Sequence, residues 1–142
     1  MKTINYSNAD RVNNPHGVDA RKLYGNEHVQ AVHILLKAGE SLKKHSTEVD
    51  VFFYVLEGDG IVEIGDEKLA VTKDTLIVSP KNIPHCLYNE SSSDFRVLVV
   101  KTPAPTPDQN KKAIEINLIT LYPIVTTQIG EIKRMISMTQ IQ

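Results

Sequence analysis

Two histidines offer the clearest chemistry in the sequence, because each stands close after a turn and where a β-strand is expected to begin. His45 follows the turn Ala38-Gly39-Glu40, and His85 follows Asn82-Ile83-Pro84. Neutral imidazole is a common ligand of transition metals, and it titrates near neutral pH, so it can also act as a base. His45 and His85 are therefore the first candidates for a functional site.

Other enzyme chemistries find little support in the sequence. Cys86 directly follows His85, so strand alternation turns its side chain to the opposite face, where a small buried thiol is expected. The chain has no glycine-rich phosphate loop and no Ser-His-Asp arrangement with local support. Its 16 basic and 17 acidic residues give a net charge of −1. Because nucleic-acid binding usually draws on an excess of positive charge, we expect no nucleic-acid partner.

The region from residue 29 to residue 102 alternates short apolar runs with turn residues at spacings of about ten residues, which is typical of an all-β sandwich or barrel. Glycines in Glu57-Gly58-Asp59-Gly60 and Gly65-Asp66 mark tight turns. The predicted strands span residues 29–37, 51–57, 60–64, 67–71, 75–79, 85–89 and 95–101. No helix is required in this region.

The spacing of the turns and histidines resembles the two paired motifs of the cupin superfamily. The first motif carries Gly, His-x-His, Glu and Gly, and the residues at those positions are Gly39, His45, Thr47, Val51 and Gly58. The second carries Gly, Pro-x-Gly-x-x-His and Asn, and the residues there are Asp74, Pro80, Asn82, His85 and Asn89. The resemblance implies a double-stranded β-helix, or jelly-roll barrel, over residues 29–102.

The same resemblance implies an incomplete metal site. In metal-bearing cupins, two histidines and a glutamate of the first motif converge inside the barrel with the histidine of the second. Here Thr47 replaces one histidine and Val51 replaces the glutamate, so His45 and His85 remain. Two imidazoles hold Zn, Fe, Mn or Ni less well than three or four protein ligands.

A tight metal site would need a further ligand, for which His16 and Asp50 are candidates. His16 lies in a Pro-His-Gly loop that could fold over a barrel mouth, and Asp50 could turn inward if its strand bulged, although simple alternation points it outward. Without a metal, His45 and His85 would be buried, hydrogen-bonded histidines with lowered pKa values, able to bind a substrate or act as a base.

The predicted strand 51–57 is apolar on both faces. One face, with neighbouring segments, should line a pocket formed by Thr47, Val51, Phe53, Val55 and Leu87. The other face carries Phe52, Tyr54 and Leu56, which need a cover. A homodimer is the simplest cover, and the N-terminal segment and the C-terminal tail are alternatives. His33 shares alternation with Lys37, so it is expected on the outer face.

Three segments are expected along the chain. Residues 1–28 should form an N-terminal arm on the outside of the barrel, and residues 29–102 the barrel itself. Residues 103–142 begin with a proline-rich linker and continue as an isoleucine-rich tail of uncertain structure, which docks on a partner subunit or contributes nothing to function.

The sequence leaves three functions open. The first is binding of a small molecule in the barrel, with a weak or incomplete divalent metal site. The second is a metal-dependent enzyme of the dioxygenase or isomerase type. The third is a structural or regulatory dimer with a vestigial pocket. A single cysteine, no apolar leader and no long apolar run favour a cytoplasmic protein that does not cross a membrane.

Overall fold

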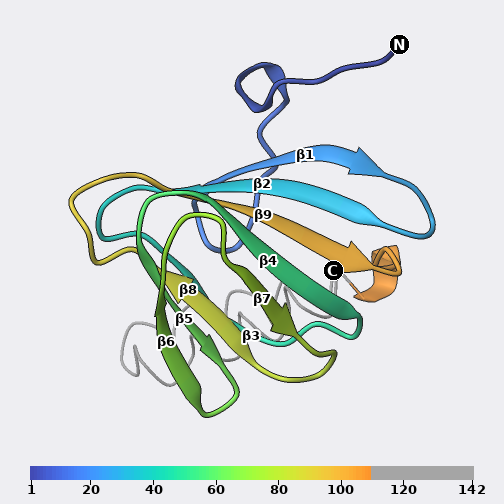
Figure 1. Ribbon diagram of the computed structural model, residues 1–142. Helices are drawn as coiled ribbons and strands as arrows, with labels where there is room; N and C mark the ends of the chain where they lie inside the picture. The colour runs from blue at the N-terminus through green and yellow to red at the C-terminus, as the bar shows by residue number, and fades with distance from the viewer. Residues whose placement is uncertain (110–142) are drawn as a thin grey trace, which may run out of the picture.

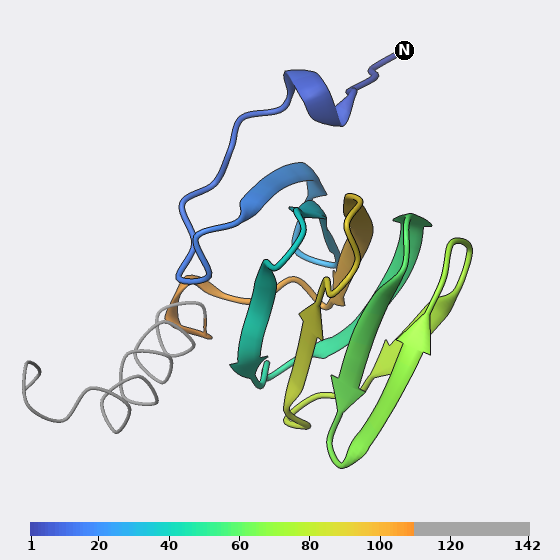
Figure 2. The same cartoon turned by 90° about the vertical axis from the view of Figure 1, so that its left-hand side faces the viewer.

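Two antiparallel β-sheets face each other in the computed structural model, which describes residues 1–109 (Figure 1). Sheet A has the strand order β1-β2-β9-β4-β7, and sheet B has the order β3-β8-β5-β6. Figure 2 shows the strands of sheet B side by side, with β3 and β6 at its edges. The strands are β1 Asp19–Gly25, β2 Gln30–Leu36, β3 Ser41–His45, β4 Asp50–Glu57, β5 Gly60–Ile64, β6 Glu67–Val71, β7 Leu76–Ser79, β8 His85–Tyr88 and β9 Phe95–Thr102. The predicted all-β jelly-roll barrel is confirmed.

The core lies between the two sheets and follows the alternation of side chains along each strand. In β4, Val51, Phe53 and Val55 are buried, whereas the residues between them are only partly buried. In β9, Phe95 and Val97 are fully buried and point to the same interior. Apolar side chains from both sheets thus meet in one cluster, which is what holds the sheets together.

Two strands were not predicted, and both are sheet edges. β1 lies within the segment expected to be an outer arm, and it pairs with β2 with a register shift between Lys22 and Tyr24. β3 carries Leu42 as its only apolar residue and pairs with β8. Edge strands are paired on one side only and tolerate polar side chains, so neither strand has the apolar alternation that marks a central strand.

Two non-glycine residues occupy the left-handed backbone region at corners of the barrel. Asp74 has φ 65° and Asn82 has φ 63°. These are the two positions at which the cupin motif carries glycine and this chain does not. Aspartate and asparagine tolerate the left-handed region better than other side chains do. The chain therefore keeps the backbone conformation of both corners without the glycines.

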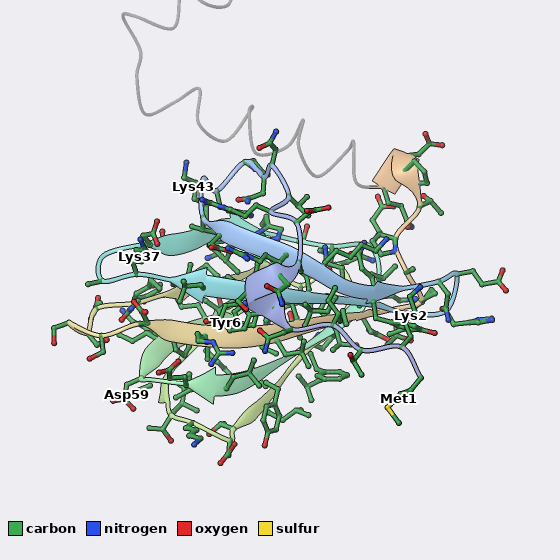
Figure 3. The ribbon with its side chains drawn as sticks, turned by 90° about the horizontal axis from the view of Figure 1, so that it is seen from above. Met1, Lys2, Tyr6, Lys37, Lys43 and Asp59 are labelled. Atoms are coloured by element: carbon green, nitrogen blue, oxygen red, sulfur yellow. The ribbon has the colours of Figure 1, made fainter. Side chains whose placement is uncertain are left out.

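The N-terminal arm is fixed on the outer face of sheet A. It includes the 3-10 turn η1 (Tyr6–Asn8). The Arg21 guanidinium donates hydrogen bonds to the carbonyl oxygens of Tyr6, Ser7 and Ala9 at 2.9, 2.9 and 3.2 Å. The Tyr6 ring stacks on His33 with 4.0 Å between centroids, and Figure 3 shows Tyr6 over the sheet. His33 therefore lies on the outer face, as predicted, but it is buried by the arm.

The C-terminal region is described only at its start. β9 ends at Thr102, where the proline-rich segment begins. Predictions for the isoleucine-rich tail from residue 110 onward lie outside the described residues. Within residues 1–109, no helix is long and apolar enough to span a membrane.

Candidate functional site

A cavity of about 430 Å³ lies inside the barrel, where β3 and β9 end and β4 and β8 begin. Its apolar wall includes Ile34, Val51, Phe53 and Val99, from β2, β4 and β9. Polar side chains line the remainder, and they include His16, His45, Thr47, His85 and Lys101. An apolar wall with a few polar groups is the usual composition of a small-molecule site.

A register shift in β3 turns His45 into this cavity. Leu42 pairs with Leu87 and His45 with His85, but the pairing is irregular between them. Leu42 and His45 both line the cavity, although residues three apart in a regular strand face opposite sides. A bulge re-aims the side chain that follows it. The His45 ring consequently meets the His85 ring edge to face, with 4.5 Å between centroids.

A chain of hydrogen bonds fixes the protons of these two histidines. His45 Nδ1 lies 2.7 Å from the Lys43 carbonyl oxygen, which only accepts, so Nδ1 carries the proton and Nε2 is a bare acceptor. His85 Nε2 lies 3.3 Å from His45 Nε2 and must therefore donate. His85 Nδ1 then accepts from the Ser79 hydroxyl at 2.7 Å, and Ser79 is fully buried. Each hydrogen bond of this series is thus donated in the direction from the buried Ser79 hydroxyl toward the Lys43 carbonyl oxygen.

His16 comes to the same cavity from the loop before β1. Its ring centroid lies 4.9 Å from that of His45. Its Nδ1 accepts a hydrogen bond of 2.9 Å from the backbone N–H of Lys43. A neutral imidazole that accepts at Nδ1 carries its proton at Nε2. His16 therefore offers the cavity an N–H donor and no free lone pair.

Lys101 is a member of this cluster that the prediction missed. It ends the inward-facing row Phe95, Val97 and Val99 of β9, and it lines the cavity. The alternation of the predicted strand 95–101 already places Lys101 on the inner face, so the signal was present in the sequence. Its ammonium lies near enough to lower the pKa values of His16, His45 and His85.

Burial keeps the three imidazoles neutral. Burial and the neighbouring His45 lower the pKa of His85 to about 3 and that of His16 to about 4. Burial also lowers the pKa of His45, although its hydrogen bond to the Lys43 carbonyl opposes this, and burial lowers the pKa of Lys101. At neutral pH the histidines therefore act as directed donors and acceptors rather than as charges.

The donor atoms do not fit a tightly held metal ion. The Thr47 hydroxyl donates to the Val49 carbonyl at 3.1 Å, and Val51 offers no donor atom. Asp50, the other predicted extra ligand, is exposed, lies outside the cavity and accepts the Lys81 amide at 2.9 Å. Over residues 1–109, no group of three His, Cys, Asp or Glu side chains is arranged to hold a metal.

The predicted pocket and outer-face residues fall into three groups. Thr47, Val51 and Phe53 line the cavity. Val55 and Leu87 do not, since both are 0% exposed and packed in the core beyond it. Both residues lie on the inward face of their strands, as the alternation predicts. Core packing fills part of that face, and only the remaining part lines the cavity. Phe52, Tyr54 and Leu56 are half-buried on the outer face of β4.

The side chain of Cys86 faces away from the cavity, as predicted. Its thiol donates a hydrogen bond to Glu63 at 2.8 Å on the outer face of sheet B. Burial and this carboxylate raise the pKa of the thiol to about 12. The thiol is therefore protonated and unreactive as a nucleophile at neutral pH.

The chain matches a known family model and is similar to archaeal proteins. Residues 32–101 match the model described as "Cupin domain". The uncharacterized protein MJ0764 of Methanocaldococcus jannaschii is 31% identical over 85 residues, which cover 59% of this chain and 73% of that protein.

Solved structures share the fold. The crystal structure of MJ0764, described as an RmlC-like cupin with a double-stranded β-helix fold, has a TM-score of 0.58 and 25% identity, covering 73% of this chain and 92% of that one. TT1209 from Thermus thermophilus has a TM-score of 0.65 and 28% identity, with coverage of 74% and 100%. A predicted oxalate decarboxylase from Thermotoga maritima has a TM-score of 0.65 at 18% identity, covering 72% and 100%, and this likeness shows the fold alone.

Proposed function

The chain belongs to the cupin superfamily, and on that premise we propose that its barrel binds a small molecule in the histidine-lined cavity. The observation that carries the proposal is the combination of an apolar wall with three imidazoles whose protons are fixed by Ser79 and the Lys43 backbone. Groups held in one orientation before binding lose less freedom when a ligand arrives. Such a cavity can select a ligand by shape and by hydrogen bonding.

A binder is favoured over a metal-dependent dioxygenase or isomerase because of the donor set. Among the described residues, only the Nε2 atoms of His45 and His85 converge, 3.3 Å apart, and Lys101 adds a positive charge nearby. Two imidazoles would hold a divalent transition metal only weakly. A weak metal site at these two atoms stays a second candidate, and any catalytic role depends on it.

Filling the cavity is expected to abolish ligand binding without unfolding the barrel. Val32 is partly buried and lines the cavity, so a larger side chain in Val32→Phe would occupy the space a ligand needs. Leu69→Phe, at an exposed position on β6, is the matched control. Thermal-shift measurements would use a panel of small organic acids, amino acids and sugars. We expect some compounds to stabilise wild type and the control but not Val32→Phe; if no compound does so, the proposal is wrong.

Rebuilding the cupin ligands separates the binder from the metal enzyme. We expect the double variant Thr47→His/Val51→Glu to bind Zn²⁺ at least tenfold more tightly than wild type, because it raises the ligands from two to four. Calorimetric titration of tag-free protein with ZnCl₂ measures both affinities. Tight, stoichiometric binding by wild type would contradict the weak site and favour the enzyme.

We also propose a homodimer formed through the outer face of β4 and β7. Phe52 and Tyr54 pair there with Val78 and Leu76, which are 66% and 51% exposed. The N-terminal arm contacts Arg21, His33 and Arg96, of β1, β2 and β9, so these contacts lie on the other half of sheet A. A contiguous apolar patch beside an edge strand is a surface that a second copy could cover.

The dimer is tested by sedimentation at micromolar concentration. We expect wild type to sediment as a dimer and Val78→Lys to sediment as a monomer, because the lysine places a charge in the apolar contact. Leu69→Lys, at an equally exposed position on β6, should remain a dimer. Wild type that sediments as a monomer would contradict this proposal.

The cytoplasmic location and the absence of nucleic-acid partners stay predictions from the sequence.

A further inference from the structure

The Lys101 ammonium is a cation placed inside the barrel without a partner among the described residues. Lys101 lies between Gln30 of β2 and Val51 of β4, and its side chain lines the cavity. Within residues 1–109, no carboxylate lies within ion-pair distance of it and no hydrogen bond to it is formed. A partly buried charge without a partner is costly, so a lysine kept at such a position points to a partner supplied from outside.

The groups around Lys101 would also favour an anion. The carboxylate that lines the cavity is that of Glu48, and its side chain is exposed. His16 presents its Nε2–H to the cavity because its Nδ1 accepts from Lys43. The side-chain amides of Gln30 and Asn82 also line the cavity and can donate. Positive charge and N–H donors thus line the same cavity as the apolar side chains.

We infer that the cavity takes a small organic carboxylate, whose oxygens are held by the Lys101 ammonium and the His16 Nε2–H group. This inference rests on the proposed function and names the ligand class for the same cavity. The apolar wall of Ile34, Phe53 and Val99 would take the hydrocarbon part of such a ligand. Among the described residues that line the cavity there is no arginine and no glycine-rich loop, two features that often recognise a phosphate.

The inference is tested with butyrate and butyramide, which have similar shape but differ in charge. Chemical-shift titration of the full chain is expected to show butyrate binding at least tenfold more tightly than butyramide. Lys101→Met should remove this preference, and His16→Asn should reduce it. Lys37→Met, which removes an exposed lysine beyond the end of β2, should leave the preference unchanged. Propyl phosphate should bind less tightly than butyrate.

The outcomes distinguish this inference from the proposed function. If butyrate and butyramide bind equally, and Val32→Phe abolishes both, the cavity binds small molecules but the carboxylate assignment is wrong. If propyl phosphate binds more tightly than butyrate, the ligand class is a phosphate and the inference is overturned. If neither probe binds, the carboxylate assignment is wrong, whereas the proposed function is decided by the wider panel of compounds. The melting temperature of each variant, with Lys101→Gln as a second substitution at this position, shows whether a loss of binding comes from misfolding. Lys101→Met should not lower the melting temperature, because an unpaired buried charge is removed.

Discussion

Gly58→Ala is expected to destabilise the barrel by about 3 kcal/mol or more, whereas Gly39→Ala should cost only about 1 kcal/mol. Both glycines have φ 83°. A Cβ at Gly58 would overlap the carbonyl oxygen of Asp94 and crowd Phe95 Cα at 3.3 Å. A Cβ at Gly39 would meet nothing within 4 Å. The pair therefore separates the cost of the left-handed backbone from the cost of a backbone clash.

Urea denaturation of both variants at pH 7 measures the difference. Equal losses of unfolding free energy would show that the strand after the turn moves away from the new methyl group at little cost. The difference matters because the close contact at Gly58 joins the end of β4 to the beginning of β9, the strand that carries Lys101.

Acidification from pH 7 to pH 4 is expected to lower the unfolding free energy, with His33 alone contributing about 3 kcal/mol. His33 is 1% exposed, and burial, Arg96 and Arg21 lower its pKa to about 4, while Asp19 opposes them. Its Nε2 accepts from Arg96 Nε at 3.0 Å, and its Nδ1 is buried without a partner. The unfolded chain takes up a proton near pH 6.5 and the folded chain does not, so stability is complete above that pH and is lost as the pH falls toward 4.

His33→Leu is expected to flatten this part of the pH profile. His28→Asn is the control, because the His28 side chain is 80% exposed. Urea denaturation at half-unit steps from pH 7 to pH 4 measures how steeply the unfolding free energy of each protein changes with pH. These slopes are compared, and not the stabilities at pH 7, because His33→Leu also removes the hydrogen-bond acceptor of Arg96. His16 and His85, whose pKa values are also lowered, add a loss of unfolding free energy on acidification in wild type and in both variants. If the slopes of His33→Leu and wild type coincide, His33 is protonated in the folded protein.

The central strands and the paired histidines could be predicted because they follow local rules. Apolar alternation marked β4 and β9, and turn residues marked the corners before His45 and His85. Edge strands β1 and β3 lack that alternation and were not predicted.

The remaining features depend on contacts between distant segments. The place of His16 is fixed by a hydrogen bond to Lys43, 27 residues away in sequence, which no local pattern encodes. Whether an inward-facing residue lines the cavity, as Val51 does, or fills the core, as Val55 does, depends on how the two sheets close around it.

One peptide segment of β3 sets the protonation pattern of two imidazoles. The Lys43 N–H donates to His16 and the Lys43 carbonyl accepts from His45, and the irregular register leaves both groups outside the pairing with β8. The Lys43 side chain is exposed, so nearly any residue except proline could supply the same two main-chain groups. A decisive part of the site is thus encoded by the backbone at a position whose side chain makes neither of the two hydrogen bonds.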